Sequence, residues 1–155
     1  MTDYEIGPAR QSEAWRIANM SRALIEEGLT WRWRPAAVAR LIRREDTEVV
    51  CVRANNLVVG FAVMQFFDDE AHLVLFAVSR LHRKKGLGRR LLEWLENMAE
   101  VAMIGTIRLE VRRKNRVGRA FYRALGYREV AVIRGYYEGR EDAVRMERTL
   151  VRVES

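Results

Sequence analysis

The sequence predicts an α/β fold of the mixed α+β kind, with a mostly antiparallel central sheet and helices on both of its faces. Segments with helical spacing come first, strand-like segments follow, and strands and helices then alternate up to a final hairpin. The links between the first strands are short enough for hairpins. The chain has 155 residues, of which 49% are hydrophobic, so it can bury the core of one domain. We therefore expect residues 1–155 to form a single domain.

Two helices are expected in the N-terminal part of the chain. In segment 10–28, RQSEAWRIANMSRALIEEG, apolar residues recur at near-helical spacing, and Gly28 stands where a helix C-cap would. In segment 33–45, WRPAAVARLIRRE, Pro35 suits the first turn of a second, short helix.

Three apolar segments then read as strands joined by the short links NN and DDE. These are EVVCVRA (48–54), LVVGFAVMQFF (57–67) and AHLVLFAVS (71–79). The single cysteine, Cys51, lies in the first of them, where a buried strand residue is expected rather than a reactive thiol. A single cysteine excludes an internal disulfide. Because the chain has only two histidines, we expect no metal cluster and no bound metal.

Helices and strands alternate in the second half. A helix is predicted where leucines recur at intervals of three and four, with the apolar residues Leu87, Leu91, Leu92, Leu95, Met98 and Ala102. Strands are predicted for TIRLEVRR (106–113), YREVAVIRGYY (127–137) and DAVRMERTLVRV (142–153), the last two around the tip EGRE. The segment NRVGRAFYRALG between them is a helix with Asn115 as N-cap and Gly126 as C-cap.

The charge is the unusual feature of the composition. The net charge is +7 and the sequence pI is about 10.2, which favours an anionic partner or simply solubility. Two segments, 80–90 and 108–119, hold six Lys or Arg each. The N-terminal MTDYEIGPAR lacks the apolar core of a secretory signal, and no apolar run has the length of a membrane span. We expect a cytoplasmic protein without a membrane partner.

The stretch HRKKGLGRRLLEWLE (82–96) places cations and two glycines at the start of a predicted helix. A nucleic-acid patch, a solvated surface and a cradle for cofactor phosphates all remain open at this point. The stretch is no dinucleotide fingerprint, because Leu91 stands where the third glycine would be, and it lacks the Gly-Lys-Ser/Thr of a Walker loop.

Physical chemistry favours the phosphate cradle. Glycines let the backbone approach a ligand, and the first amides of a helix have no intrahelical acceptor. The helix dipole adds partial positive charge at that end, where an anion can dock. Cations placed there oppose the dipole by a few tenths of a kcal/mol each. A bound polyanion would offset that cost.

At this point the sequence resembles a family. FAVSRLHRKKGLGRRLLEWLE (76–96) is similar to the acetyl-coenzyme A signature of the GNAT (GCN5-related N-acetyltransferase) superfamily, in which Arg/Gln-x-x-Gly-x-Gly/Ala follows a strand and starts a helix. RLEVRRKNRVGRAFYRALGYRE (108–129) extends the match, since members often carry Asn before a helix that ends in Phe-Tyr-x-x-x-Gly-Phe/Tyr. The resemblance spans residues 57–150 and implies a GNAT fold with acetyl-CoA as co-substrate. Members often have proline where this chain has Arg80.

The resemblance implies a cofactor site. Main-chain groups of strand residues would hold the pantetheine arm, loop and helix amides would bind the pyrophosphate, and Asn115 would contact the cofactor from the next helix. The residues so implied are Phe76, Ala77, Val78, Arg83, Lys84, Lys85, Gly86, Leu87, Gly88, Arg89 and Asn115. The side chains of Lys84, Lys85, Arg89 and Arg90 suit the charge of the phosphates.

Acetyl transfer requires a neutral amine and a proton for the departing thiolate. By themselves, Glu110 reads as a solvated strand carboxylate and Tyr122 as a packing aromatic. The chain resembles bacterial ribosomal-protein alanine N-acetyltransferases, in which a Glu in LEVR acts as base and a Tyr twelve positions later acts as acid. Glu110 and Tyr122 reproduce both residue types and the spacing. The resemblance thus implies that Glu110 takes a proton, directly or through water, and that Tyr122 protonates the sulfur.

The acceptor is expected to be a protein N-terminal α-amine. RGYYEGREDAVRM (134–146) resembles the hairpin of protein N-terminal acetyltransferases, where tyrosines such as Tyr136 and Tyr137 form one wall of a peptide groove. Ordinary cross-strand packing is the alternative. The loop GLTWRWRP (28–35) would form the other wall, although Trp31 and Trp33 match no ribosomal-enzyme pattern. Those tryptophans are interpreted as core anchors, a substrate lid or a stacking surface.

Three rival interpretations stay open. The first is a GNAT enzyme that acetylates a small-molecule amine, an amino acid or a lysine side chain. The second is a basic nucleic-acid-binding module, which we disfavour because the 80–90 cluster contains no aromatic residue. The third is a GNAT fold that senses acetyl-CoA without catalysis, which the pair of Glu110 and Tyr122 argues against. The sequence leaves the oligomeric state open, a homodimer included.

Overall fold

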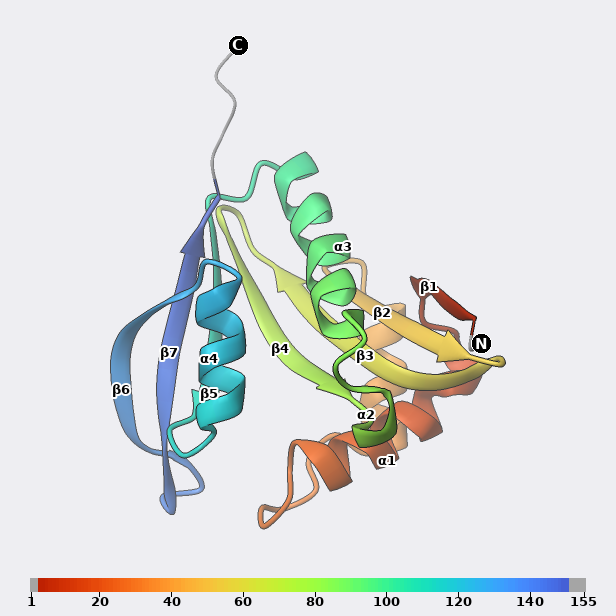
Figure 1. The fold of residues 1–155 in the computed structure, drawn as a ribbon, viewed down its shortest axis with the longest axis horizontal. Coiled ribbons are helices and arrows are strands. Elements are labelled where there is room, and N and C mark those ends of the chain that lie inside the picture. The colour runs from red at the N-terminus through yellow and green to blue at the C-terminus, as the bar shows by residue number, and fades with distance from the viewer. Residues whose placement is uncertain (1–2, 151–155) are drawn as a thin grey trace. The chain divides into compact units, whose positions relative to one another are not determined.

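The computed structural model describes residues 3–150, and Figure 1 shows their path. The helices are α1 (Ala14–Leu24), α2 (Pro35–Arg43), α3 (Leu87–Val101) and α4 (Arg116–Ala124), with one-turn 3-10 helices η1 (Gln11–Glu13) and η2 (Arg80–His82). The strands are β1 (Tyr4–Pro8), β2 (Thr47–Ala54), β3 (Leu57–Phe66), β4 (Glu70–Val78), β5 (Thr106–Arg112), β6 (Arg128–Tyr137) and β7 (Glu141–Thr149).

Hydrogen bonds join the strands in the order β1-β2-β3-β4-β5-β7-β6. The pairs β1–β2, β2–β3, β5–β7 and β6–β7 are antiparallel, whereas β4 and β5 run parallel. The crossover between these two parallel strands is the helix α3, as a parallel connection requires. The predicted fold class, a mixed and mostly antiparallel sheet with helices, is therefore confirmed.

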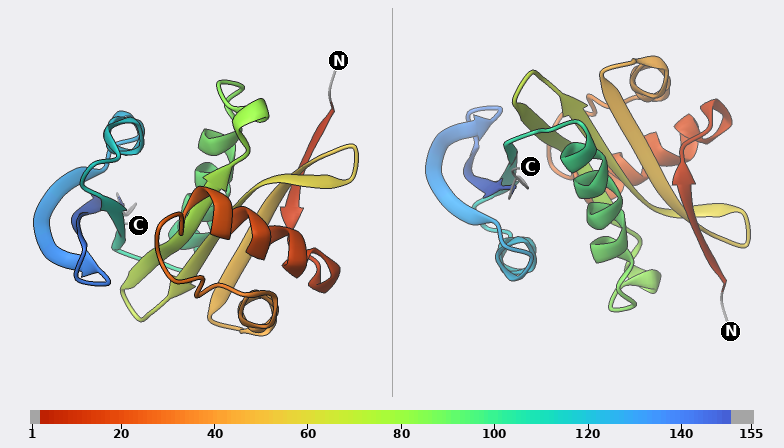
Figure 2. Two further views of the ribbon diagram at one scale, coloured as in Figure 1. Left: turned by 90° about the horizontal axis from the view of Figure 1, so that it is seen from below. Right: turned by 90° about the horizontal axis from the view of Figure 1, so that it is seen from above.

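The described chain divides into two compact units. Residues 3–65 and 74–98 form the first unit, with α1 and α2 on one face of its strands and α3 on the other (Figure 2). Residues 66–73 and 99–150 form the second unit, in which α4 lies on one face of β5, β6 and β7. The expectation of one domain over residues 1–155 stays a prediction.

The turn between β2 and β3 follows from its two asparagines. Asn55 and Asn56 have φ angles of 52° and 65°, so both adopt the left-handed conformation. That pair of conformations defines the type I′ turn, whose twist matches that of the flanking strands. Asparagine tolerates the left-handed region better than most residues do. The short link therefore closes the hairpin that the sequence predicts.

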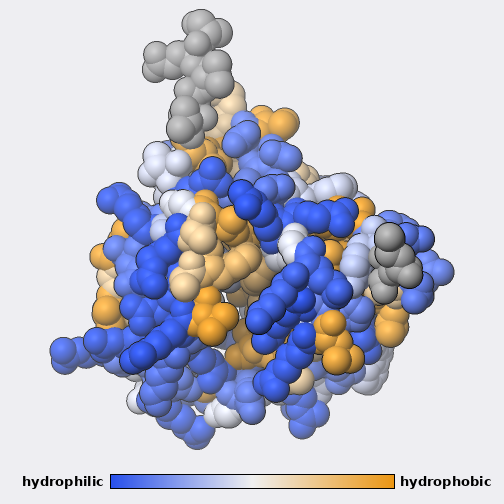
Figure 3. All heavy atoms as spheres, viewed as in Figure 1, coloured by the Kyte–Doolittle hydropathy of each residue, from blue (hydrophilic) through white to orange (hydrophobic). Residues whose placement is uncertain are grey.

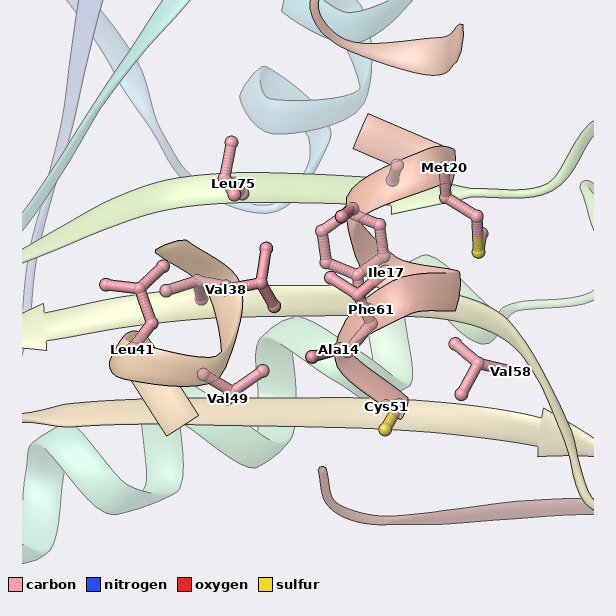
Figure 4. Packing of buried hydrophobic residues seen from close by; sticks show 13 residues of the cluster. Ala14, Ile17, Met20, Val38, Leu41, Val49, Cys51, Val58, Phe61 and Leu75 are labelled. Atoms are coloured by element: carbon pink, nitrogen blue, oxygen red, sulfur yellow. The ribbon is translucent and has the colours of Figure 1, made fainter. Parts of the chain in front are cut away.

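The core of the first unit lies between its strands and the helices α1 and α2 (Figure 4). Ile17 and Val38 point from the helices toward Phe61 of β3, and all three are fully buried. Strand β2 is buried on both faces, since Val50 and Val52 are buried as completely as Cys51 between them. Burial raises the pKa of the Cys51 thiol to about 12, with the charge of Glu13 as a further cause, as an inert core cysteine requires.

The leucines of α3 are buried as predicted, but the end of the helix differs. Ala99 is fully buried, Ala102 lies beyond the last helical residue and is exposed, and Met98 is partly exposed. Helix α1 also ends earlier than Gly28, because the amides of both Ile25 and Glu26 donate to the carbonyl of Ser21. Gly28, with a φ angle of 79°, belongs to a turn rather than to the C-cap.

Two further elements differ from the prediction. Strand β1 is unpredicted, because its segment YEIGP is short and polar and pairs with residues 50–54, far along the chain. Strand β7 ends at Thr149, and the part of the predicted strand in residues 151–153 lies outside the described residues. None of the helices in residues 3–150 combines the length and the apolar character that crossing a membrane requires.

We expect Phe61→Ala to lower the free energy of unfolding by about 3–5 kcal/mol, because it removes a fully buried ring and leaves a cavity. Phe67→Ala is the matched control, since Phe67 is 53% exposed. It should cost less than about 1 kcal/mol. Urea unfolding of both variants measures the difference. Equal losses in the two variants would contradict the assignment of Phe61 to the core.

Candidate active site

The loop between β4 and α3 lies in the first unit. After η2, Lys84 and Gly86 both adopt left-handed conformations, with φ angles of 61° and 75°. A Cβ atom built on Gly86 would meet no atom within 4 Å, so open space surrounds its backbone. Leu87, which is 2% exposed, then fixes the start of α3 in the core. The predicted helix start and the unusual torsions at Gly86 are thus both present.

The backbone amides of this loop have no internal acceptor. Within residues 3–150, no backbone carbonyl accepts a hydrogen bond from the amides of residues 84–89. The first amide of the helix region with an acceptor is that of Arg90, 3.1 Å from the carbonyl oxygen of Gly86. Free donors at a helix N-terminus form an anion site, and they fit a pyrophosphate group.

The two basic segments differ in how their charges are compensated. Four arginines of segment 108–119 form ion pairs, and these pairs are Arg108–Glu70, Arg112–Glu141, Arg113–Asp142 and Arg119–Glu129. In segment 80–90 of the described chain, the one ion pair joins Arg89 to Glu93, at 3.1 Å. Hydrophilic residues cover most of the face drawn in Figure 3, on which α3 and the loop before it lie (Figure 1). Segment 80–90 therefore keeps the positive charge that an anion would neutralise.

The strand residues of the implied cofactor site follow the parallel pairing of β4 with β5. That pairing covers Glu70–Leu73 and ends with Leu73 opposite Leu109. Phe76, Ala77 and Val78 lie beyond the last of these pairs, at the C-terminal end of β4. The side chain of Arg83 returns to this end, because its Nε donates to the carbonyl of Val78 at 3.1 Å.

Asn115 caps a helix. Its side-chain oxygen accepts the amide of Gly118 at 2.9 Å, so the predicted N-cap of α4 is confirmed. A Cβ atom on Gly118 would come within 2.6 Å of the Asn115 side chain, which explains the glycine at this position. The cofactor contact that the resemblance implies for Asn115 stays a prediction.

The Glu110 carboxylate lies in the second unit and is 3% exposed. Its Oε1 atom lies 2.7 Å from Nε2 of His72 on β4 and accepts the Tyr136 hydroxyl of β6 at 3.2 Å. Its Oε2 atom accepts Nε of Arg145 on β7 at 3.0 Å. Glu110 and Arg145 are also direct cross-strand partners in the β5–β7 register. Three neighbouring strands therefore contribute a side chain to one carboxylate.

These partners decide the charge of Glu110. Burial alone would raise the pKa of its carboxyl, but the hydrogen bond and charge of His72, the hydrogen bond of Arg145 and the charge of Arg108 outweigh it. They lower the pKa to about 2. Glu110 is therefore a carboxylate at every physiological pH. The solvated strand carboxylate that the sequence alone suggests is wrong, since the side chain is buried.

Tyr122 faces the core of the second unit. It is 8% exposed, and its ring lies edge-on to those of Phe121 and Tyr127, with centroid distances of 5.4 and 5.9 Å. Burial first, and then the neighbouring Tyr137, raise the pKa of the Tyr122 phenol. The phenol therefore keeps its proton at neutral pH and can donate it.

The β6–β7 hairpin carries two adjacent tyrosines, Tyr136 and Tyr137, and the first of them contacts Glu110. The register of the two strands is irregular between Ile133 and Tyr137, where Gly135 adopts a φ angle of 65°. Such a bulge re-aims the side chains beside it. The rings of Tyr136 and Tyr137 pack edge-on at 4.9 Å, and the Tyr136 hydroxyl reaches Glu110. Burial and the neighbouring acidic groups raise the pKa of both phenols.

Trp31 and Trp33 lie between α1 and α2, in the first unit. Both are partly buried and pack against the core cluster, so of the three interpretations the structure supports the core anchor. The indole nitrogen of Trp31 donates to the carbonyl of Ala18 at 3.2 Å. The guanidinium groups of Arg22 and Arg34 lie 4.9 and 5.2 Å from its ring. Substrate binding by these tryptophans stays a prediction.

The buried carboxylate of Glu26 binds the backbone of the loop that carries Trp31 and Trp33. Glu26 is 7% exposed, and its Oε1 accepts the amides of Arg32 and Trp33 at 2.7 and 3.1 Å. Its Oε2 accepts the hydroxyl of Ser21 at 2.8 Å. Sequence reasoning missed this residue, because EEG reads as a solvated helix end.

His72 and Arg145 are the other residues that sequence reasoning missed. Each has a local signal, since His72 is the one ionisable residue within the apolar run from Ala71 to Val78, and Arg145 alternates with apolar positions. Neither signal identifies a partner, which only the strand register supplies. No group of three or more His, Cys, Asp or Glu in residues 3–150 is arranged to hold a metal ion, and the metal-free site stays a prediction.

The chain is similar in sequence to known N-acetyltransferases. The chain is 41% identical over 95 residues to the ribosomal protein bS18-alanine N-acetyltransferase of Escherichia coli, a match that covers 59% of this chain and 64% of that enzyme. It is 30% identical over 138 residues to the N-alpha-acetyltransferase RimI of Mycobacterium tuberculosis, covering 85% and 83% of the two chains. The shared region thus spans less than two thirds of the Escherichia coli enzyme.

Solved structures extend the likeness to the whole chain. The crystal structure of the ribosomal-protein-S18-alanine N-acetyltransferase from Escherichia coli superposes with a TM-score of 0.83 at 28% identity, covering 99% of this chain and 97% of the other. The sequence profile of the acetyltransferase (GNAT) family matches residues 12–127, which include the loop before α3, Glu110 and Tyr122. The chain belongs to the acetyltransferase (GNAT) family.

Proposed function

We propose that this protein is an acetyl-CoA-dependent N-acetyltransferase whose acceptor is the N-terminal α-amine of a protein, of the ribosomal-protein alanine type. The observation that carries the proposal is the loop of residues 83–89. The amides of its residues 84–89 have no backbone acceptor in the described chain, and segment 80–90 keeps most of its positive charge. Such a loop at a helix start fits the pyrophosphate of a coenzyme A better than a solvated turn. Family membership and the names of the relatives support the same chemistry.

Each part of the chain would have a distinct task. Acetyl-CoA supplies a thioester whose carbonyl carbon an amine can attack. The amides of residues 84–89 would bind its pyrophosphate, and Lys84, Lys85 and Arg90 would balance the remaining phosphate charge. Main-chain groups of Phe76–Val78 would hold the pantetheine arm as an added strand. A strand addition supplies hydrogen bonds along an extended ligand at little cost in conformational change.

Glu110 would manage the proton of the attacking amine. An α-amine has an ordinary pKa of about 7.7–8.0, so a useful fraction is already neutral near neutral pH. A carboxylate with a pKa of about 2 is a weak base, but it stabilises the positive charge that develops on nitrogen during the attack. The proton would leave through water beside the Glu110 carboxylate, whose Oε1 lies 2.7 Å from Nε2 of His72. His72 would thus position that carboxylate.

Tyr122 would supply the proton that the leaving sulfur needs. Its raised pKa keeps the phenol protonated. The ordinary pKa of a thiol is about 8.5, below that of the phenol, so the proton transfer would accompany the breaking of the C–S bond, and the phenolate would then regain a proton from water. Burial of the ring against Tyr127 fixes the direction of the hydroxyl.

The acceptor assignment rests on the relatives and on the hairpin. Two relatives carry names that specify an α-amine or a ribosomal-protein alanine. In this chain the tyrosines that would line a peptide groove connect to the proton-handling centre, because Tyr136 donates to Glu110. A small-molecule amine or a lysine side chain is the alternative acceptor. We further propose the cytoplasm as the site of action, where nascent ribosomal proteins and acetyl-CoA meet.

We expect both Glu110→Gln and Tyr122→Phe to lower kcat at least about 100-fold while the dissociation constant for acetyl-CoA stays the same. Single-turnover kinetics together with calorimetric binding separate the two quantities. The matched controls are Glu129→Gln, a carboxylate that pairs with Arg119 outside the site, and Tyr127→Phe, which removes a neighbouring phenol. Near-wild-type turnover in both site variants would contradict the roles assigned to the pair.

Acetyl-CoA should stabilise the fold, by about 2.7 kcal/mol at a ligand concentration of about 100 times its dissociation constant. Turnover should be faster with peptides that begin with alanine than with the same peptides bearing a blocked N-terminus and one lysine. The panel also includes diamines and free amino acids. A protein that acetylates a small amine but leaves every free N-terminus unmodified would show that the acceptor is wrong while the donor is right.

The lowered pKa of Glu110 links its charge to stability. The unfolded chain titrates this carboxyl near its ordinary value of 4.5, and the folded chain near 2, so the stabilisation is complete above the first value and is lost as pH falls through the second. Between pH about 6 and about 2, we expect wild type to lose up to about 3 kcal/mol more of its free energy of unfolding than Glu110→Gln. Urea titrations at several pH values measure this. Parallel pH profiles for the two proteins would refute the ion-paired carboxylate.

A further inference from the structure

Tyr4 of β1 contacts His82, which directly precedes the loop of residues 83–89. The phenol oxygen of Tyr4 lies 2.9 Å from Nδ1 of His82, a hydrogen bond in either tautomer of the imidazole. The two rings meet edge-on, with centroids 5.7 Å apart and planes at 90°. Both side chains are half-buried, and both belong to the first unit.

His82 lies at the junction between η2 and the candidate pyrophosphate loop. It is the last residue of η2, and the candidate pyrophosphate loop follows immediately. On the N-terminal side, the amide of Ser79 donates to the carbonyl of Val59 at 2.7 Å, and that of His82 donates to Ser79 at 2.9 Å. On the C-terminal side, buried Leu87 starts α3. The exposed residues 83–86 thus span two fixed points, His82 and Leu87.

Without the hydrogen bond between Tyr4 and His82, fewer contacts would hold residues 80–86 in place. The bonds of His82 to Ser79, of Arg83 to Arg80 and of the Arg83 side chain to Val78 would remain, but in the described chain no hydrogen bond would then tie residues 80–86 to β1, β2 or β3. Ordering a backbone residue costs on the order of 1 kcal/mol, and a ligand that orders a loose loop must supply that free energy from its own contacts. A loop already held in its binding conformation avoids this cost.

We propose that Tyr4 and His82 form a positioning pair that holds the loop of residues 83–89 in its acetyl-CoA-binding conformation. The pair acts through the loop and touches no reacting atom. The role also gives a reason for β1, whose short segment pairs with β2 and brings the Tyr4 phenol to the loop. This inference rests on the proposed binding of acetyl-CoA by that loop.

The test is a double-mutant cycle on coenzyme A binding. Tyr4→Phe keeps the ring and removes only the hydroxyl, and His82→Phe keeps a ring and removes the nitrogen that bonds it. We expect each variant to bind coenzyme A about 5–10-fold more weakly by calorimetry, and the double variant to bind no more weakly than either single one. The kcat at saturating acetyl-CoA and the KM for the acceptor should stay within about twofold of wild type.

Matched measurements separate the outcomes. Tyr127→Phe, which removes a phenol in the second unit, should leave coenzyme A affinity unchanged. Wild-type protein that fails to bind coenzyme A overturns the proposed function and this inference together. Wild type that binds, with Tyr4→Phe equal to it, overturns the positioning pair alone. A loss in Tyr4→Phe that His82→Phe does not share, or two losses that simply add, also overturns it. A loss of unfolding free energy in the unliganded variants that equals their loss of binding free energy overturns it as well.

Discussion

One buried carboxylate organises the second unit. Glu110 on β5 binds His72 of β4, Tyr136 of β6 and Arg145 of β7, so side chains from every strand of that unit converge on two oxygen atoms. A buried charge is tolerated only when its hydrogen-bonding capacity is filled, and here both oxygens are occupied. The same contacts hold the carboxylate charged. Glu110 therefore links side chains of β4, β6 and β7 to β5 at one point of the second unit.

The two basic segments of the chain use their charge in opposite ways. Arginines of segment 108–119 are paired with carboxylates of neighbouring strands and hairpins, and they serve the structure of the second unit. Segment 80–90 stands at a helix N-terminus, where cations oppose the helix dipole, and within the described chain only Arg89 of this segment forms an ion pair. Net charge alone cannot distinguish these cases, because a paired and an unpaired arginine count equally. The distinction appears only when each cation is assigned a partner.

Local sequence signals predicted most elements and the chemistry of the donor site. Pro35, the Asn55–Asn56 turn, the Asn115 cap and the periodic leucines of α3 all depend on neighbours within a few residues, so a pattern can reveal them. Strand β1 escaped because it owes its existence to pairing with β2, some forty residues away. The partners of Glu110 escaped for the same reason. A strand sequence states which residues share a face, but not which residue of the next strand stands opposite.

The loop between α1 and α2 shows how one buried carboxylate can fix the backbone of a loop. Glu26 accepts two successive loop amides and a serine hydroxyl, so the backbone around Trp31 and Trp33 is bound from within. The tryptophans add packing against the core, and two arginines flank the Trp31 ring. A segment held by this many contacts loses little further entropy when a ligand binds. If the loop contributes to the choice of acceptor, it does so through the shape and charge of the surface it already presents, rather than by closing over the acceptor.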